Sequence, residues 1–285
     1  MVEHVTIFEV GARDGLQNEK VMIPTEKKIE LIDLLSDCGF TKIETTAFVS
    51  PKWVPQMADA AEVMAGILRR PEISYAVLTP NMKGYKRAKA AGASEVAVFG
   101  AASEGFSQAN VNCSIAETIE RFLPVTAAAR EDGIPIRGYI SCVTDCPYDG
   151  PTPPHMVSDM AEKLLAAGCY EISLGDTIGQ GTPDTIAAML DAVLEVVPGA
   201  QLAGHYHDTA GRALSNIEVS LEKGLRTFDS SVGGLGGCPY APGAAGNVAT
   251  QAVIELVETM GFETGIHGDR LAEATAFAVG LRSEA

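Results

Sequence analysis

The 285-residue sequence has no run of about 18 consecutive apolar residues, so a helix that spans a membrane is not expected. Positive charge is also scarce, because 21 lysines and arginines face 37 aspartates and glutamates, for a formal net charge of −16. A surface of that sign argues against nucleic acid and anionic membranes as partners. An anionic small molecule is still possible, because a local cluster of lysine and arginine can oppose the overall field.

The six cysteines lack the close, regular spacing of a disulfide scaffold, and in a chain of this length they are expected to be reduced thiols. Cys142 and Cys146 lie four residues apart, but no second pair completes a thiolate zinc site. The first ten residues, MVEHVTIFEV, have neither the basic and apolar regions of a secretory signal nor the arginine- and serine-rich character of a transit peptide. These features predict a cytoplasmic protein that begins with a strand.

Neither a dinucleotide-binding glycine motif after the first strand, nor a P-loop, nor a flexible linker is present. Instead, eight short apolar runs alternate with eight longer helical patterns. Most runs lack polar alternation at their centres, which is typical of parallel strands that are covered on both faces. The runs are residues 5–10, 42–48, 73–79, 95–101, 135–142, 170–176, 201–208 and 227–233. We therefore predict one domain over residues 1–285, an α/β fold of the (β/α)8 TIM-barrel type, with a doubly wound sheet as the alternative.

Several helix ends have recognisable signals. Thr25 is expected to cap a helix that runs to Cys38, and Thr182 is expected to open another that runs to 197. Ser114 and the glutamate three residues later form a capping-box pattern. The tail from Gly268 onward predicts an extra C-terminal helix that packs outside the barrel or against a partner.

Polar residues collect where the predicted strands end, which is where a barrel places its function. His205 and His207 close the seventh run, and side chains at i and i+2 of a strand point to the same side. Two converging imidazoles are half of a divalent metal site, although both could instead be buried core histidines. Asp14 follows the first run and Asp176 ends the sixth; taken singly, one could be a turn residue and the other a helix cap. Glu44 interrupts the apolar second run.

A glycine-rich segment over residues 233–246 follows the eighth run. Its six glycines could give simple flexibility. The Cys-Pro-Tyr-Ala-Pro sequence inside it is stiff, however, and favours a shaped loop that lets the backbone approach a ligand. Cys238 would then lie on an accessible loop near cationic groups, where the pKa of a thiol can be lowered.

Taken together, these motifs resemble the 3-hydroxy-3-methylglutaryl-coenzyme A lyase family, within a larger group of metal-dependent barrel lyases and synthases. The resemblance covers nearly the whole chain, through residues 9–20, 43–46, 48–57, 78–81, 171–179, 205–209 and, most specifically, 231–241. The related synthases usually have glutamate where this chain has Leu16, and they lack the cysteine loop, which favours the lyases. The chain departs from the family pattern at Ala12, Tyr206 and Gly233, and none of these is an expected ligand.

The resemblance implies a divalent metal ion, Mg²⁺ or Mn²⁺, held by Asp14, His205, His207 and Asn247. One carboxylate, two imidazoles and an amide oxygen agree with such an ion, and an octahedral site would keep two positions for substrate or water. Ligand type alone leaves Zn²⁺ open. A 3-hydroxy acid could fill the two free positions through its hydroxyl and one carboxylate oxygen.

The activity implied is retro-Claisen cleavage of (S)-3-hydroxy-3-methylglutaryl-CoA to acetyl-CoA and acetoacetate, a step of leucine catabolism. The hydroxyl loses its proton, a carbon–carbon bond breaks, and a thioester enolate is left to be protonated. The roles we assign are stabilisation of the enolate oxygen by Arg13, protonation of the enolate carbon by Cys238, proton transfer by His205, and orientation of these groups by Asp176 and Glu44.

The implied partner is an acyl-CoA substrate, whose phosphates could meet Lys20 and Lys52, and a homodimer is a family-level expectation. Three alternatives remain open from the residues themselves. The first is a related aldol-type lyase or synthase that acts on another 3-hydroxyacyl-CoA. The second is a metal-dependent hydrolase, which would not need Cys238 or Arg13. The third is a non-catalytic barrel that binds metal for stability.

Overall fold

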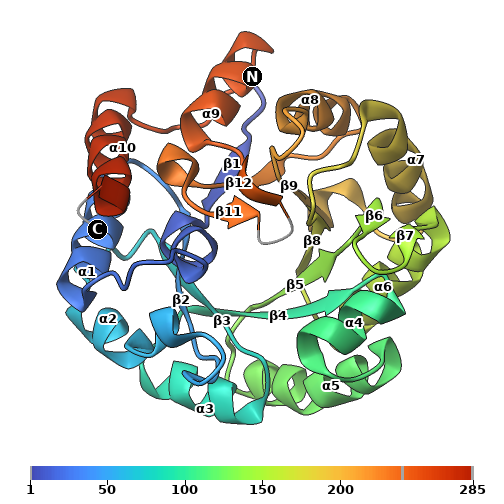
Figure 1. Ribbon diagram of the computed structural model, residues 1–285, viewed down its shortest axis with the longest axis horizontal. Helices are drawn as coiled ribbons and strands as arrows, with labels where there is room; N and C mark the ends of the chain where they lie inside the picture. The colour runs from blue at the N-terminus through green and yellow to red at the C-terminus, as the bar shows by residue number, and fades with distance from the viewer. Residues whose placement is uncertain (1, 239–240, 284–285) are drawn as a thin grey trace.

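In a computed structural model that describes residues 2–238 and 241–283, eight parallel strands close into a barrel (Figure 1). The barrel strands are β1 (Thr6–Glu9), β2 (Lys42–Ala47), β3 (Ser74–Leu78), β4 (Glu95–Ala101), β5 (Ile136–Ser141), β8 (Glu171–Asp176), β9 (Leu202–Tyr206) and β10 (Thr227–Ser230). Their order around the barrel is β1-β10-β9-β8-β5-β4-β3-β2. The predicted TIM barrel is therefore confirmed, and the doubly wound sheet is wrong.

Helices ring the barrel, and short elements lie between several strands and helices (Figure 1). The helices are α1 (Thr25–Ser36), α2 (Ala60–Gly66), α3 (Met82–Ala90), α4 (Glu104–Val111), α5 (Ile115–Glu131), α6 (Pro154–Ala167), α7 (Pro183–Leu194), α8 (Ala213–Glu222), α9 (Thr250–Thr259) and α10 (Gly268–Ser283). The short elements are the helical turns η1 (Gly11–Gly15), η2 (Pro55–Met57), η3 (Gly199–Gln201) and η4 (Val232–Gly234), with the hairpins β6 (Asp145–Cys146)–β7 (Gly150–Pro151) and β11 (Gly237–Cys238)–β12 (Ala241–Ala245). The extra C-terminal helix is confirmed as α10, which packs against α1 and η4. Within the described residues, no helix is both long and apolar enough to cross a membrane.

All eight predicted runs contain a barrel strand, and six of the strands end earlier than their runs. The clearest case is β9, which ends at Tyr206, so that His207 lies just beyond the strand. There the backbone leaves the barrel sheet, and His207 forms an isolated antiparallel bridge with Asn247. This departure brings the segment after β12 against the end of β9.

The helix signals were partly right. Ser114 makes the predicted capping box with Glu117, and Thr182 caps α7. The prediction for Thr25 was wrong, because Pro24 precedes the first turn of α1 and no side chain caps it. The hydroxyl of Thr25 donates instead to a carboxylate oxygen of Asp59, over 2.8 Å.

Charged side chains occupy part of the barrel interior, beneath the rim. Arg137 is fully buried, and its guanidinium donates to Asp229 through Nη2 (2.7 Å) and Nη1 (3.0 Å) and to Glu171 through Nε (2.7 Å). The ring of Phe8 lies 4.2 Å from the guanidinium carbon. A buried charge is tolerated only when it is paired and fully hydrogen-bonded, so this pairing keeps a carboxylate ionised directly below the rim.

Candidate active site

Arg13 and Asp14 are presented by η1, a single π-helical turn that follows β1. The amides of Arg13, Asp14 and Gly15 all donate to the carbonyl of Val10, over 2.8 to 3.2 Å. Gly11 begins the turn, and a Cβ there would lie 2.7 Å from a carboxylate oxygen of Glu9. A larger residue would therefore push the turn, and with it Arg13 and Asp14, out of place.

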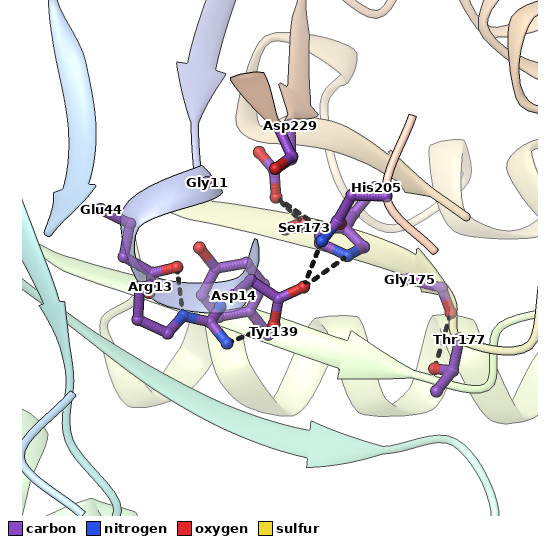
Figure 2. A network of polar contacts seen from close by, with 12 residues as sticks. Gly11, Arg13, Asp14, Glu44, Tyr139, Ser173, Gly175, Thr177, His205 and Asp229 are labelled. Carbon is purple, nitrogen blue, oxygen red and sulfur yellow. Dashed lines mark hydrogen bonds and ion pairs between the residues drawn. The ribbon is translucent and has the colours of Figure 1, made fainter. Parts of the chain in front are cut away.

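Asp14, His205 and His207 form a possible metal centre. Their ligand atoms all lie within 4.8 Å of one another, close to the roughly 4.2 Å between opposite ligands of one ion with bonds of about 2.1 Å. The two imidazole rings converge, with centroids 5.3 Å apart. The predicted convergence of the two histidines is therefore observed. Asp14, an acid from the beginning of the chain, joins them and lies beside His205 (Figure 2).

The chemistry of these donors fits a cation. Nδ1 of His207 is buried and has no hydrogen-bond partner within the described chain. Burial and the neighbouring His205 lower the pKa of His207 to about 4, so its imidazole is neutral at pH 7. Burial alone would raise the pKa of Asp14, but Arg13 and the two histidines lower it to about 2. A neutral imidazole beside an ionised carboxylate is the state that metal binding requires.

Asp229, at the end of β10, orients His205. Its Oδ2 lies 3.0 Å from Nδ1 of His205 and accepts a hydrogen bond from Ser173 over 2.8 Å (Figure 2). This contact turns Nε2 of His205 toward Asp14, whose Oδ2 is 3.9 Å away. Burial opposes protonation of the ring, but the hydrogen bond and the charge of Asp229 outweigh it and raise the pKa of His205. A carboxylate behind a ligating histidine is a common support of metal sites.

Asn247 lies against the same cluster. Its amide nitrogen donates to Oδ2 of Asp14 over 2.8 Å. The backbone bridge to His207 fixes this position. A half-turn of the amide about its terminal bond would put the oxygen, the atom that ligates cations, in place of the nitrogen. All four predicted ligands are thus adjacent, and three of them already present ligand atoms to one another.

Arg13 is held on two sides. Its Nε donates to Oε2 of Glu44 over 2.6 Å and its Nη1 to Asp14 over 2.5 Å, and its guanidinium carbon lies 5.4 Å from the ring of Tyr139 (Figure 2). Among the described residues, Nη2 has no partner. Burial raises the pKa of Glu44 despite the nearby arginine, and Oε1 of Glu44 is buried without a partner. The arginine therefore keeps one donor free at the cavity wall.

A cavity of about 810 Å³ opens over this cluster, and its wall includes Arg13, Asp14, His205 and His207. A side pocket of about 300 Å³ adjoins it and is lined by Lys20 and Trp53, among others. Lys20 is exposed there. Lys52 is also exposed, and its ammonium lies 5.3 Å from the centre of the Trp53 ring. Lys20 thus lines the side pocket, and Lys52 lies beside Trp53, a residue that lines both spaces.

The structure does not show the side chains of two predicted catalytic residues, Asp176 and Cys238, in the cavity wall. Asp176 is fully buried, and its carboxylate accepts hydrogen bonds from Thr144 and from the amides of Gln180 and Gly181. It shapes the loop after β8, and the residues on either side of it line the cavity. The backbone of Cys238 lies in β11, next to a glycine of the cavity wall, but its side chain lies outside what the structure describes.

Sequence reasoning did not identify Asp229, Arg137 and Tyr139 as parts of the site. Each lies inside a segment that was read only as a strand. The available signal was a charged residue within an apolar run, as in Thr-Phe-Asp-Ser at residues 227–230. The pairing of Arg137 with Asp229 spans 92 positions, which spacing alone cannot reveal.

Glu9, at the end of β1, predicts a specific pH dependence of stability. Burial raises the pKa of this carboxyl from 4.5 to about 7, against hydrogen bonds from Thr250, Val232 and Gly11. Between these pH values the unfolded chain loses a proton that the folded chain keeps, so the free energy of unfolding falls as the pH rises. Over the whole window the loss is about 3 kcal/mol, at about 1.4 kcal/mol per pKa unit.

Glu9→Gln keeps the shape of the side chain and cannot ionise. We expect its free energy of unfolding to exceed that of the unmodified chain at pH 8 and to lack the decline between pH 5 and 8, as measured by urea denaturation. The exposed Glu162→Gln variant on α6 is the control. Parallel pH profiles for Glu9→Gln and the unmodified chain would contradict this assignment.

Comparison with known proteins gives consistent results. Residues 4–278 match the HMGL-like protein family. The mitochondrial hydroxymethylglutaryl-CoA lyase of Bos taurus is 56% identical over 275 residues, which cover 96% of this chain and 85% of the relative. For the cytoplasmic 3-hydroxy-3-methylglutaryl-CoA lyase of Mus musculus the identity is 55%, over 96% of this chain and 80% of the relative.

Solved structures agree with these matches. The HMG-CoA lyase of Brucella melitensis superposes with a TM-score of 0.98 at 65% identity, over 99% of each chain. An HMG-CoA lyase from Acinetobacter baumannii, in complex with coenzyme A and 3-methylmalate, gives a TM-score of 0.93 at 36% identity, over 98% of this chain and 92% of that one. The carboxyl transferase domain of Rhizobium etli pyruvate carboxylase, at 16% identity and a TM-score of 0.72, shares the fold alone.

Proposed function

The chain belongs to the HMGL-like family, and from that premise we propose that it cleaves (S)-3-hydroxy-3-methylglutaryl-CoA to acetyl-CoA and acetoacetate, a step of leucine degradation. The observation that carries the proposal is the group of Asp14, His205 and His207 beside Arg13 in one cavity. Relatives named as HMG-CoA lyases, at 54 to 65% identity over nearly the whole chain, support the same reaction.

We propose that Asp14, His205, His207 and Asn247 hold one divalent cation, with Mg²⁺ or Mn²⁺ favoured by the hard oxygen ligands. Such a cation would lower the pKa of the substrate hydroxyl and fix its orientation. Support comes from Nδ1 of His207, which is buried without a partner in the part of the chain that the structure describes, and from the proximity of the ligand atoms. Asp229 would keep His205 in the orientation that presents Nε2.

Arg13 is proposed to stabilise the enolate. When the bond between C2 and C3 of the acyl group breaks, its electron pair moves into the thioester and leaves negative charge on the thioester oxygen. Nη2 of Arg13, which has no partner among the described residues, is a donor at the cavity wall, and Glu44 and Asp14 hold the other nitrogens in place. Donors that are already in place where charge develops are effective because they need no reorganisation during the reaction.

Two proton transfers complete the proposed reaction. The substrate hydroxyl loses its proton as the ketone forms, and His205 is the group that we assign to this transfer. Because its Nδ1 is hydrogen-bonded to Asp229, the proton would go to Nε2, which would have to leave the cation while it carries the proton. The enolate carbon gains a proton from the thiol of Cys238, which yields acetyl-CoA. Glu44 and Asp176 are proposed to orient these groups, Glu44 directly through Arg13 and Asp176 through the loop after β8.

The remaining proposals concern binding and assembly. The complex of the A. baumannii relative with coenzyme A supports an acyl-CoA substrate. We assign to its phosphates Lys20, which lines the side pocket, and Lys52, which lies beside Trp53. We propose that the barrel and α10 act as one catalytic domain, in a homodimer. A cytoplasmic location is supported by Cys38, Cys113, Cys142, Cys146 and Cys169, which are all free thiols. Gel filtration with light scattering would test the dimer.

The deciding experiment is incubation of the purified protein with 3-hydroxy-3-methylglutaryl-CoA and Mg²⁺. We expect acetoacetate and acetyl-CoA in equal amounts. Free coenzyme A with 3-hydroxy-3-methylglutarate would instead identify a thioester hydrolase. If neither pair forms, a panel of other 3-hydroxyacyl-CoA thioesters tests the related aldol-type chemistry, and turnover of one of them in place of this substrate would overturn the proposal.

A further inference from the structure

Two loops form the wall between the main cavity and the side pocket. Residues 17–24 connect η1 to α1, and residues 48–59 connect β2 to α2. Gln17 and Asn18 from the first loop, with Trp53 and Val54 from the second, line both spaces.

Apart from an ion pair between Glu19 and Arg282, the side chains of the first loop from residue 19 on bury little surface. Val21 and Met22 are 42% and 59% exposed, and Lys20 is exposed as well. Ile23 is the one apolar side chain between residues 19 and 24 that is buried. A loop with so little buried surface has a low local stability unless other groups bind its backbone.

Gln56, in η2 of the second loop, supplies those bonds. Its side-chain oxygen accepts a hydrogen bond from the amide of Ile23 (3.0 Å), and its side-chain nitrogen donates to the carbonyls of Val21 (2.7 Å) and Glu19 (3.4 Å). Gln56 is 4% exposed. One carboxamide thus makes hydrogen bonds to three backbone groups of the loop.

Gln56 is itself fixed from α1. Its carbonyl accepts a hydrogen bond from the ammonium of Lys28, which also pairs with Asp59 over 2.8 Å. The same carboxylate accepts the hydroxyl of Thr25, which was predicted as a cap. The side chain of Lys28 is only 4% exposed, so this ammonium is compensated entirely by the second loop. The first turn of α1 and the second loop therefore hold each other in one arrangement.

We propose that Gln56 is a positioning residue for the coenzyme A end of the substrate. It holds residues 19–23 so that Lys20 and the side pocket keep a fixed geometry toward a phosphate-bearing ligand. The inference rests on the proposed function, because it takes the phosphates of coenzyme A as the ligand of Lys20. It assigns to Gln56 an effect on binding of the distal part of the substrate, and no contact with the reacting atoms.

The test compares two substrates in the Gln56→Leu variant, which keeps the size of the side chain and removes all three bonds. With 3-hydroxy-3-methylglutaryl-CoA we expect KM to rise about 10- to 100-fold, on the scale of a few hydrogen bonds, and kcat to stay within about threefold. With the pantetheine thioester of the same acid, which lacks the nucleotide and its phosphates, kcat/KM should match that of the unmodified chain. Titration calorimetry with free coenzyme A should show the same loss of affinity.

Controls separate positioning from general damage. Gln201→Leu removes a carboxamide bond to the carbonyl of Tyr170 at the opposite end of the barrel. It should change neither kcat nor KM for either thioester. Gln56→Asn keeps the amide on a shorter side chain. Its KM for 3-hydroxy-3-methylglutaryl-CoA should lie between that of Gln56→Leu and that of the unmodified chain. Cleavage by trypsin after Lys20 should be faster in Gln56→Leu, while bound Mn²⁺ per chain stays the same.

Several outcomes would overturn the inference. One is an equal loss of kcat/KM for both thioesters, which indicates general damage, and another is unchanged affinity for coenzyme A. If Gln56→Leu does not fold, the same comparison with Gln56→Asn decides the matter. If the unmodified protein cleaves no 3-hydroxy-3-methylglutaryl-CoA, the proposed function fails, whereas the coenzyme A titration and the trypsin assay still test the role of Gln56.

Discussion

His207→Ala is expected to lose its bound divalent metal and to turn over at least about 10³-fold more slowly, since a metal ion that stabilises developing charge contributes several kcal/mol. The physical reason is the buried Nδ1 of His207, which has no partner in the described chain although polar atoms of this kind are normally paired. Removal of this imidazole leaves Asp14 and His205 facing each other without the third ligand. Elemental analysis of the dialysed protein and a steady-state assay measure the two effects.

The exposed His155→Ala variant on α6 is the control for this experiment. A second readout is independent of activity: Mn²⁺ should raise the melting temperature of the unmodified, metal-stripped protein and of His155→Ala, but not that of His207→Ala. Linkage gives about 2.7 kcal/mol of stabilisation when the free ion is at 100 times its Kd. Unchanged metal content in His207→Ala would remove His207 from the ligand set.

The barrel could be predicted because parallel strands that are buried on both faces have to be apolar over their whole length. β3, in which Tyr75, Ala76, Val77 and Leu78 are all buried, shows this most clearly. The ends of the strands could not be predicted, because tertiary contacts decide them. His207 continues the pattern of β9, but its backbone pairs with Asn247, forty positions later in the chain. The π-helical form of η1 is equally invisible in its sequence, although that turn aims Arg13 and Asp14.

The candidate metal ligands were predictable because a barrel brings the carboxyl ends of all its strands to one rim. The charges beneath the rim were not. Asp229 accepts hydrogen bonds from Arg137 and contacts His205, one of the candidate ligands, but Arg137 and Asp229 come from strands far apart in the chain. The position of a residue at the end of a predicted strand also does not show whether its carboxylate faces the cavity, as that of Asp14 does, or accepts hydrogen bonds from backbone amides, as that of Asp176 does.

The glycine loop after β10 brings its backbone against the candidate ligands. At Gly236, where φ is +99°, a Cβ would lie 3.0 Å from the amide nitrogen of Asn247 and 3.3 Å from the Cα of Gly15. Glycine is needed at such a place because an L side chain rarely adopts this φ and would also collide. Gly237 then lines the cavity, and Cys238 follows it directly. The loop is therefore shaped where it meets the site, which favours the role proposed for the thiol.

Cys238→Ser is accordingly expected to lower kcat by about 10²- to 10⁴-fold, the usual contribution of a general acid. A hydroxyl is a far weaker acid than a thiol, whose pKa is ordinarily about 8.5, so the enolate carbon would lack its proton donor. The variant should keep its metal, because the thiol is not a proposed ligand. It should also lose the exchange of acetyl-CoA methyl hydrogens with D₂O, a reaction that needs the same proton transfer but no carbon–carbon cleavage.

Cys169→Ala is the matched control, because burial raises the pKa of that thiol to about 12 and it lies at the other end of β8 from the cavity. It should exchange hydrogens and cleave substrate at nearly the unmodified rate. Near-normal turnover of Cys238→Ser would show that another group protonates the enolate. Loss of turnover with exchange intact would place the role of Cys238 in the cleavage step, because the proton donor to carbon would then still be present.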